Sequence, residues 1–281
     1  MRARFHETAQ HFLLAADRFL RSEPLSTNVV AVVAARIAAG AQPPRYDHLW
    51  ATVEDSDGRV LGAAMHTPPH ALLVSRMPVE AAAVLAGALA DARRALPGVN
   101  GAVSTTGPFA DAWNARTGQV STVLTAMRLY RLGQLVRPSG VPGRPAAAAE
   151  PADIALVAEW LGAFHDEAQP HAPVDDWRAS AERRVVAGEV YVWHDWGTPV
   201  AVAAVSAPAV GVARVGPVYT PPGQRRRGYG TAVTAEATAA ALAAGAEHVV
   251  LYTDLANPTS NSIYQAIGYR PDHDAEERSF Q

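Results

Sequence analysis

The most informative segment of this chain reads Val218-Tyr219-Thr220-Pro221-Pro222-Gly223-Gln224-Arg225-Arg226-Arg227-Gly228-Tyr229-Gly230. It follows a strand-like apolar run, residues 210–218, and precedes an alanine-rich, helix-like run, residues 231–244. Glycines at such a junction let the backbone adopt positive φ and approach a ligand closely. Because the free N–H groups of a helix's first turn attract an anion, this segment predicts a phosphate-binding site.

The glycine spacing differs from that of the common nucleotide-binding loops. The chain contains no lysine, which excludes Gly-x-x-x-x-Gly-Lys-Ser/Thr, and it has no Gly-x-Gly-x-x-Gly followed by an acidic residue on the next strand. The pattern that is present is Arg225-x-x-Gly228-x-Gly230. It resembles the pyrophosphate loop of the GCN5-related N-acetyltransferases (GNATs), which hold acetyl-CoA.

A second motif follows at residues 251–271. Residues 249–253 read as a short β-branched strand, Asn257 and Ser260 are typical helix-capping residues, and Gly268 ends the predicted helix. An Asn after a strand, a short helix carrying Tyr264 and then Gly-Tyr resemble the GNAT element that follows the pyrophosphate loop. The two motifs, in this order, identify residues 218–271 as part of a GNAT fold.

The two halves of the chain share one pattern. The hairpin at residues 49–64 has a counterpart at 190–205, and each is followed by a further strand and an alanine-rich helix. The helical segments before the hairpins are residues 7–20, 29–39, 153–168 and 176–187. We therefore expect an α/β (α+β) fold of two tandem GNAT-like domains, each a mixed, mostly antiparallel twisted sheet flanked by helices. The CoA site is expected at the splayed strands of the C-terminal domain.

The Pro/Gly-rich segment 137–145 reads as a linker between an N-terminal domain, 1–136, and a C-terminal domain, 146–281. In the first half, the strand at 71–75 leads into its helix without a glycine loop, so no nest of N–H groups for a pyrophosphate is encoded. We predict that the N-terminal domain is degenerate and that the C-terminal domain is catalytic. A chain built this way resembles the tandem-domain bacterial GNATs.

The resemblance implies a set of cofactor-binding residues. Main-chain N–H groups at the end of the splayed strand meet the thioester carbonyl, those of the loop hold the pyrophosphate, and Asn257 bonds the pantetheine arm. The side chain of Arg225 braces the loop. The full set is Val218, Tyr219, Thr220, Arg225, Arg226, Arg227, Gly228, Tyr229, Gly230, Thr231, Asn257, Ser260 and Tyr264. Simpler interpretations stay open: a helix cap for Asn257, a packed aromatic for Tyr264 and a solvated patch for the arginines.

The resemblance also implies the chemistry, direct transfer of acetyl from acetyl-CoA to a primary amine in a ternary complex. The chain has no cysteine, so no enzyme thioester carries the acyl group. Tyr264 matches the family's usual proton donor to the CoA thiolate. Asp254 is the first candidate for the base, and His165, Asp166 and Glu167 are alternatives. No spacing of His, Asp and Glu matches a zinc pattern, so we expect no metal.

Composition limits the classes of partner. The formal net charge is only −3, which argues against a broad nucleic-acid-binding face. The apolar runs are interrupted, and no apolar signal core follows the first residues, so neither a spanning helix nor export is expected. We expect a cytoplasmic protein that acts on a small-molecule or peptide amine, without nucleic-acid or membrane partners. Homodimerisation stays open.

Two alternative functions fit the same motifs. One is an acyl-CoA-binding regulatory module without turnover, and Tyr264 argues against it because binding alone needs no proton donor. The other is a mycothiol-synthase-like acetyltransferase, which the tandem architecture allows but no residue singles out. The acceptor itself has no signature in the chain.

Overall fold

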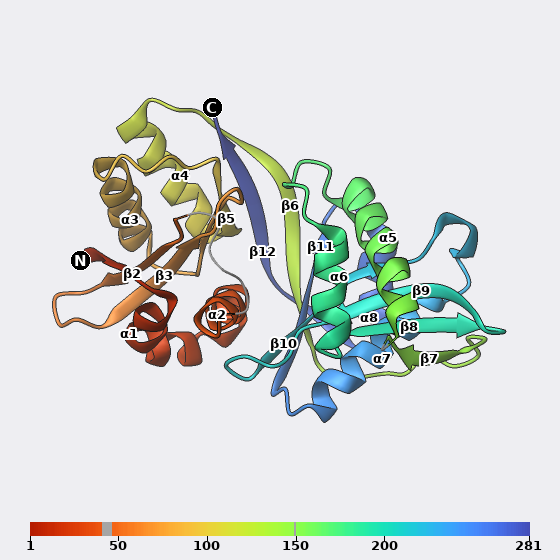
Figure 1. Ribbon diagram of the computed structural model, residues 1–281. Helices are drawn as coiled ribbons and strands as arrows, with labels where there is room; N and C mark the ends of the chain where they lie inside the picture. Colours follow the sequence, from red (N-terminus) through yellow and green to blue (C-terminus); the bar gives the residue numbers. More distant parts are fainter. Residues whose placement is uncertain (41–46, 149) are drawn as a thin grey trace. The chain divides into compact units, whose positions relative to one another are not determined.

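The computed structural model describes residues 1–40, 47–148 and 150–281. The chain forms two compact units, the first made of Met1–Arg128 with His273–Gln281 and the second of Leu129–Asp272. Each unit combines a mixed sheet with flanking helices, which confirms the predicted fold class (Figure 1). Two long strands, β6 (Ser121–Leu132) and β12 (Tyr269–Phe280), contribute residues to both units.

The first unit carries helices on both faces of its sheet (Figure 1). Its remaining elements are β1 (Arg2–His6), α1 (Ala9–Ser22), α2 (Pro24–Ala38), β2 (Leu49–Glu54), β3 (Val60–His66), β4 (Leu72–Val74), α3 (Val79–Asp91), β5 (Gly98–Ala102) and α4 (Val103–Thr117). The strand order is β1-β2-β3-β4-β5-β12, and β4 and β5 run parallel. Helices α1 and α2 pack together on one face, and α3 and α4 pack together on the other.

The end of the chain completes the core of the first unit. Residues 275–279 of β12 pair antiparallel with residues 98–102 of β5. Phe280 is buried, and its ring centroid lies 5.5 Å from that of Trp113 and 6.4 Å from that of Phe109. Aromatic rings packed at such distances stabilise a core beyond the area that they bury.

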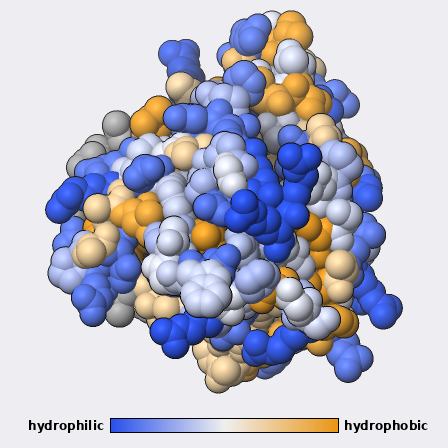
Figure 2. All heavy atoms as spheres, turned by 90° about the vertical axis from the view of Figure 1, so that its right-hand side faces the viewer, coloured by the Kyte–Doolittle hydropathy of each residue, from blue (hydrophilic) through white to orange (hydrophobic). Residues whose placement is uncertain are grey.

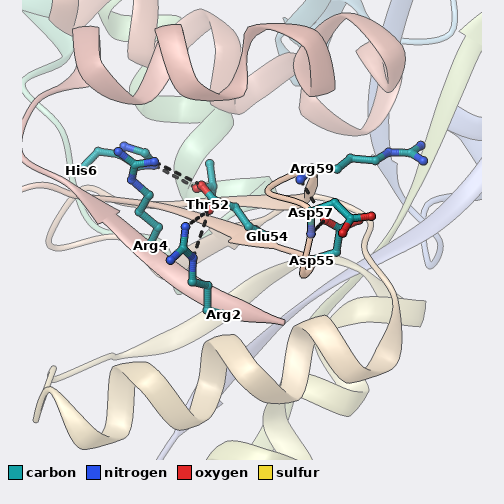
Figure 3. Close-up of polar contacts among 8 residues, drawn as sticks. All are labelled: Arg2, Arg4, His6, Thr52, Glu54, Asp55, Asp57 and Arg59. Carbon is teal, nitrogen blue, oxygen red and sulfur yellow. Dashed lines mark hydrogen bonds and ion pairs between the residues drawn. The ribbon is translucent and has the colours of Figure 1, made fainter.

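The edge strand β1 is held to β2 by polar contacts on one face (Figure 3). Arg2 and Arg4 converge on the buried Glu54, at 3.1 and 3.6 Å. His6 Nε2 lies 3.0 Å from the Thr52 hydroxyl, and burial lowers the pKa of this imidazole. These three side chains occupy every second position of β1 and therefore share one face of the strand. Their partners on β2 lie opposite or diagonally across.

The second unit is built in the same way (Figure 1). Its elements are β7 (Arg144–Ala147), α5 (Pro151–Ala168), α6 (Trp177–Val186), β8 (Val190–Asp195), β9 (Thr198–Val205), β10 (Val212–Tyr219), α7 (Tyr229–Ala243), β11 (His248–Asp254) and α8 (Pro258–Ala266). The strand order is β6-β11-β10-β9-β8-β7, with β10 and β11 parallel. Strand β9 is buried on both faces because Ala201 and Ala203 join the core under α7 while Val202 and Ala204 join the core under α5 and α6.

The compact units divide the chain at other positions than the predicted domains, 1–136 and 146–281. Segment 137–145, expected as a linker, lies within the second unit, where Trp193 Nε1 donates to Pro142 O at 2.7 Å and β7 pairs with β8. Its Pro and Gly residues give the segment an irregular backbone path. The segment is nevertheless packed on the second unit, because Val141 contacts the core under α7. The last residues of the chain return to the first unit because β5 needs a partner strand.

Replacing Phe280 by Ala should lower the free energy of unfolding by about 3–5 kcal/mol, since the change leaves a cavity between two aromatic rings. Leu14→Ala, at a side chain that is 79% exposed, is the matched control and should change it by less than about 0.5 kcal/mol. Urea unfolding measures both. Equal effects of the two substitutions would contradict this role of the chain's last strand.

Candidate functional site

Strands β10 and β11 diverge inside the second unit. Their parallel pairing joins residues 212–214 to residues 248–250, and both strands then continue without pairing to each other. Against β9, the register of β10 shifts between Val215 and Val218. The predicted strand 210–218 begins later, because Val210 and Gly211 form a tight turn with positive φ, and it departs from β11 after Arg214. The splay leaves an open edge on each of the two parallel strands.

A loop, residues 220–228, joins β10 to α7. Gln224 N donates to Pro221 O, Arg225 N to Pro222 O, and Ala232 N to Gly228 O. Within the described part of the chain, the N–H groups of residues 226–231 donate to no backbone oxygen, and no side chain caps the helix at Gly228. These amides include the first turn of α7, where the helix dipole adds positive potential.

Glycine is favoured at the end of this loop and in the first turn of α7. Gly228 has φ of +83°, and an added Cβ there would lie 3.0 Å from Val141 Cγ2. An added Cβ at Gly230 would lie 3.2 Å from the Thr220 hydroxyl. A side chain at Gly228 would therefore press on Val141, and one at Gly230 would press on Thr220 at the start of the loop.

Arg225 braces the loop. Its Nε donates to Thr220 O at 2.9 Å, which ties the middle of the loop back to the end of β10. Its Nη2 donates to both carboxylate oxygens of Glu167, at 2.8 and 2.6 Å, so the loop is also held to the end of α5. The Tyr219 hydroxyl donates to Glu167 at 3.3 Å, and burial, followed by this carboxylate, raises the pKa of that phenol.

A second contact fixes the start of α7. Tyr229, the first residue of the helix, is buried, and its hydroxyl donates to Asp195 at the end of β8. This hydrogen bond raises the pKa of the Tyr229 phenol, and Arg227 opposes that shift. The hairpin between β8 and β9 is therefore bound to the helix end that carries the free amides.

The turn from β11 into α8 is ordered by side chains. Asn257 caps α8, accepting from Ser260 N at 3.0 Å, as its sequence predicts. Asn261 Nδ2 donates to Asp254 O and to Asn257 O, at 3.0 and 2.7 Å. The buried Tyr130 donates its hydroxyl to Asn261 Oδ1 at 2.9 Å. Sequence reasoning missed Tyr130, because a contact from a distant strand leaves no signal in local spacing.

Tyr264 lies half-buried on α8. Its ring meets Tyr269 edge-on, with centroids 6.3 Å apart, and it packs against the core under α7. Burial raises the pKa of the Tyr264 phenol to about 12. The residue is thus both a packed aromatic and a phenol that keeps its proton at neutral pH.

The candidate bases occupy different surroundings. Asp254 is exposed at the end of β11, and its Oδ1 accepts from Ala256 N at 2.7 Å. His165 is buried and its ring lies 5.0 Å from that of Trp177, so it is a packing residue. Glu167 is committed to Arg225 and Tyr219, while Asp166 is exposed.

The first unit has no equivalent of this loop between its described strand β4 and helix α3. Strand β4 stays paired with β5 to its last residue, Val74, opposite Gly101. Residues 75–78 then lead directly into α3, and the side chain of Met77 packs against Gly62. An added Cβ at Gly101 would lie 2.5 Å from Val74 O, so the two parallel strands are in close contact where β10 and β11 diverge.

Within the described ranges, 1–40, 47–148 and 150–281, no helix is long and apolar enough to cross a membrane. No three His, Asp or Glu side chains gather there in a way that would hold a metal ion.

Comparisons with known proteins agree with this geometry. Residues 154–269 match the model of the acetyltransferase (GNAT) family. A GCN5-related N-acetyltransferase from Sphaerobacter thermophilus is 15% identical, with a TM-score of 0.62 over 99% of this chain and 95% of that one. One from Kribbella flavida is 21% identical, with a TM-score of 0.55 over 79% and 88%. No curated protein sequence is similar enough to count as a relative.

A tandem GNAT protein from the clavulanic acid biosynthesis pathway matches the whole length of the chain. It is 17% identical, with a TM-score of 0.53 over 99% of this chain and 98% of that one. Identities this low show a shared fold. The predicted GNAT resemblance and tandem fold are therefore confirmed.

The raised pKa of Tyr264 predicts how stability changes with pH. An unfolded tyrosine loses its proton near pH 10, whereas folded Tyr264 keeps it up to about pH 12. Its contribution is fully present below pH 10 and is lost as pH rises to 12, so the free energy of unfolding falls over this interval. Tyr264→Phe should make that fall shallower in urea unfolding at pH 9, 10 and 11. An unchanged slope would contradict the burial of this phenol.

Proposed function

Because residues 154–269 match the model of the acetyltransferase (GNAT) family, we propose that this chain transfers an acetyl group from acetyl-CoA directly to a primary amine. The acceptor is a small molecule or a peptide, and the reaction takes place in a ternary complex. The second unit binds acetyl-CoA, and the first unit, without the loop, does not.

The run of free amides at residues 226–231 is the observation that carries this proposal. A diphosphate offers several anionic oxygens, which suit consecutive N–H groups at a helix N-terminus. The site fits the group in a second respect, since glycine at 228 permits the positive φ of +83° at the start of α7 and glycine at 230 leaves the space beside the Thr220 hydroxyl open. Arg225 keeps the loop in shape through Thr220 and Glu167 and is not itself the phosphate ligand.

The splayed edge of β10 is proposed to hold the thioester. Within the described residues, Thr220 N donates to no backbone oxygen, which leaves it free to meet the carbonyl oxygen as negative charge develops there. Asn257, at the facing turn, is proposed to bond the pantetheine arm through its side-chain nitrogen, since its oxygen caps α8. Ser260, one turn into the same helix, is proposed to line this side of the site.

Tyr264 is proposed to stabilise the departing thiolate. A phenol with a pKa of about 12 is a weaker acid than a thiol, whose pKa lies near 8.5, so it does not lose its proton fully to the thiolate. It acts instead as a hydrogen-bond donor that is always protonated at neutral pH. The benefit arises in the transition state, where charge collects on sulfur.

Asp254 remains our proposed base. Continuing the parallel register of β10 and β11 places Asp254 near the level of Val218, at the end of the splay. One of its carboxylate oxygens is used by Ala256 N, and the other has no hydrogen bond within the described ranges. That oxygen is proposed to take the proton of the acceptor amine, directly or through water.

Gly228→Asp should weaken acetyl-CoA binding by about 100-fold or more, because it adds a negative charge beside the diphosphate site and its Cβ would press on Val141 at 3.0 Å, which distorts the loop. Gly188→Asp is the matched control: Gly188 also has positive φ, +69°, with nothing within 4 Å of an added Cβ. Calorimetric titration with acetyl-CoA measures both variants. Unchanged affinity in Gly228→Asp would refute the loop assignment.

Tyr264→Phe should lower kcat about 100-fold and leave the KM for acetyl-CoA within about threefold, since the lost hydrogen bond forms only as charge develops. Tyr191→Phe, in the same unit, is the control and should keep full kcat. Steady-state kinetics over a panel of amines measures both. Tight acetyl-CoA binding by the wild type without turnover of any amine would instead identify a regulatory module.

A further inference from the structure

Trp196 has no structural reason to be a tryptophan. It lies at the tip of the β8–β9 hairpin and is 98% exposed. Its φ is +48°, and Gly197 follows with +79°. Turns of this kind favour Asn or Gly at the first position, and a bulky side chain is strained there. Neither packing nor turn preference accounts for the indole, so its exposed face is available to a ligand.

The hairpin tip flanks the loop at residues 220–228. Tyr219, the last residue of β10, pairs with Val202, whereas β9 begins at Thr198, so the hairpin extends past β10 alongside the loop. Asp195, next to Trp196, accepts the hydroxyl of Tyr229 at the start of α7. The hairpin reaches the right-hand edge of Figure 1, and the face seen from that side mixes hydrophilic side chains with small apolar patches (Figure 2).

Two exposed arginines belong to the segment that carries the free amides. Arg226 and Arg227 are exposed, and Arg227 lies close enough to the Tyr229 phenol to shift its pKa. Arg225 is paired with Glu167, and the Tyr229 phenol that Arg227 approaches donates to Asp195, next to Trp196. Amides and arginines for phosphate beside an aromatic face are the combination that binds a nucleotide.

The strand order tells which part of acetyl-CoA lies near Trp196. The thioester is assigned to the gap between β10 and β11, and the order β11-β10-β9-β8 puts the hairpin on the other side of β10. The acetyl group and the acceptor therefore lie away from the hairpin, and the portion beyond the diphosphate is the adenosine.

We propose that Trp196 stacks on the adenine ring of CoA and contributes a purine subsite to the pyrophosphate loop. This inference rests on the proposed function, because it takes the loop as the diphosphate site. A planar base stacks favourably on an indole ring whatever hydrogen-bonding groups it carries at its edge. The stacking energy offsets the strain of the turn only when the ligand is bound.

The test compares two ligands with the full-length protein by calorimetric titration. One is CoA, and the other is 4′-phosphopantetheine, which lacks the adenosine. Trp196→Ala should weaken CoA binding by about tenfold or more and leave 4′-phosphopantetheine binding unchanged. Trp196→Phe, which keeps an aromatic face, should stay within about threefold of the wild type for both ligands. Val186→Ala, at another exposed side chain of the same unit, is the control.

A second measurement separates stacking from folding. Trp196→Asn should raise the thermal midpoint, because Asn suits positive φ, and should still weaken CoA binding. Equal CoA affinity of the wild type and Trp196→Ala would overturn the inference, and so would equal losses for both ligands. If the wild type bound neither ligand, the result would refute the proposed function itself and, with it, the stacking of Trp196.

Discussion

The backbone N–H groups of residues 226–231 have no backbone acceptor within the described residues, and contacts within the second unit hold them in fixed positions. The loop reaches this conformation because Gly228 adopts positive φ and because Arg225 ties it to Thr220 and Glu167. Tyr229, bound to Asp195, fixes where the helix begins. Because these N–H groups are already fixed in position, an anion binds to them without the cost of ordering the loop first.

Comparison of the two units shows how one fold supports a site in one copy and not in the other. Both contain a pair of parallel strands, and in both the first strand of the pair is followed in the chain by a helix. In the first unit Val74 and Gly101 stay in close contact and Met77 fills the approach to α3. In the second unit the strands diverge and a glycine loop intervenes. A few residues at one strand end therefore decide whether the fold presents amides to a cofactor.

Local sequence predicted the loop, the cap at Asn257 and the hairpins, because turn chemistry and capping act over a few residues. It did not predict that segment 137–145 packs on the second unit or that Phe280 completes the first, since such pairing joins residues far apart in the chain. Glu167 illustrates the same limit at the site: its position suggested a base, and the structure shows it holding Arg225. Tyr130 and Asp195 carry no local signal at all.

The most direct measurement follows the amide resonances of Gly228, Gly230 and Thr231 by ¹H–¹⁵N spectroscopy while acetyl-CoA is added. If these N–H groups donate to the diphosphate, their proton shifts should move downfield together and saturate with the binding isotherm. Resonances that stay in place at saturating acetyl-CoA would show that the loop is not the phosphate site and would contradict the account.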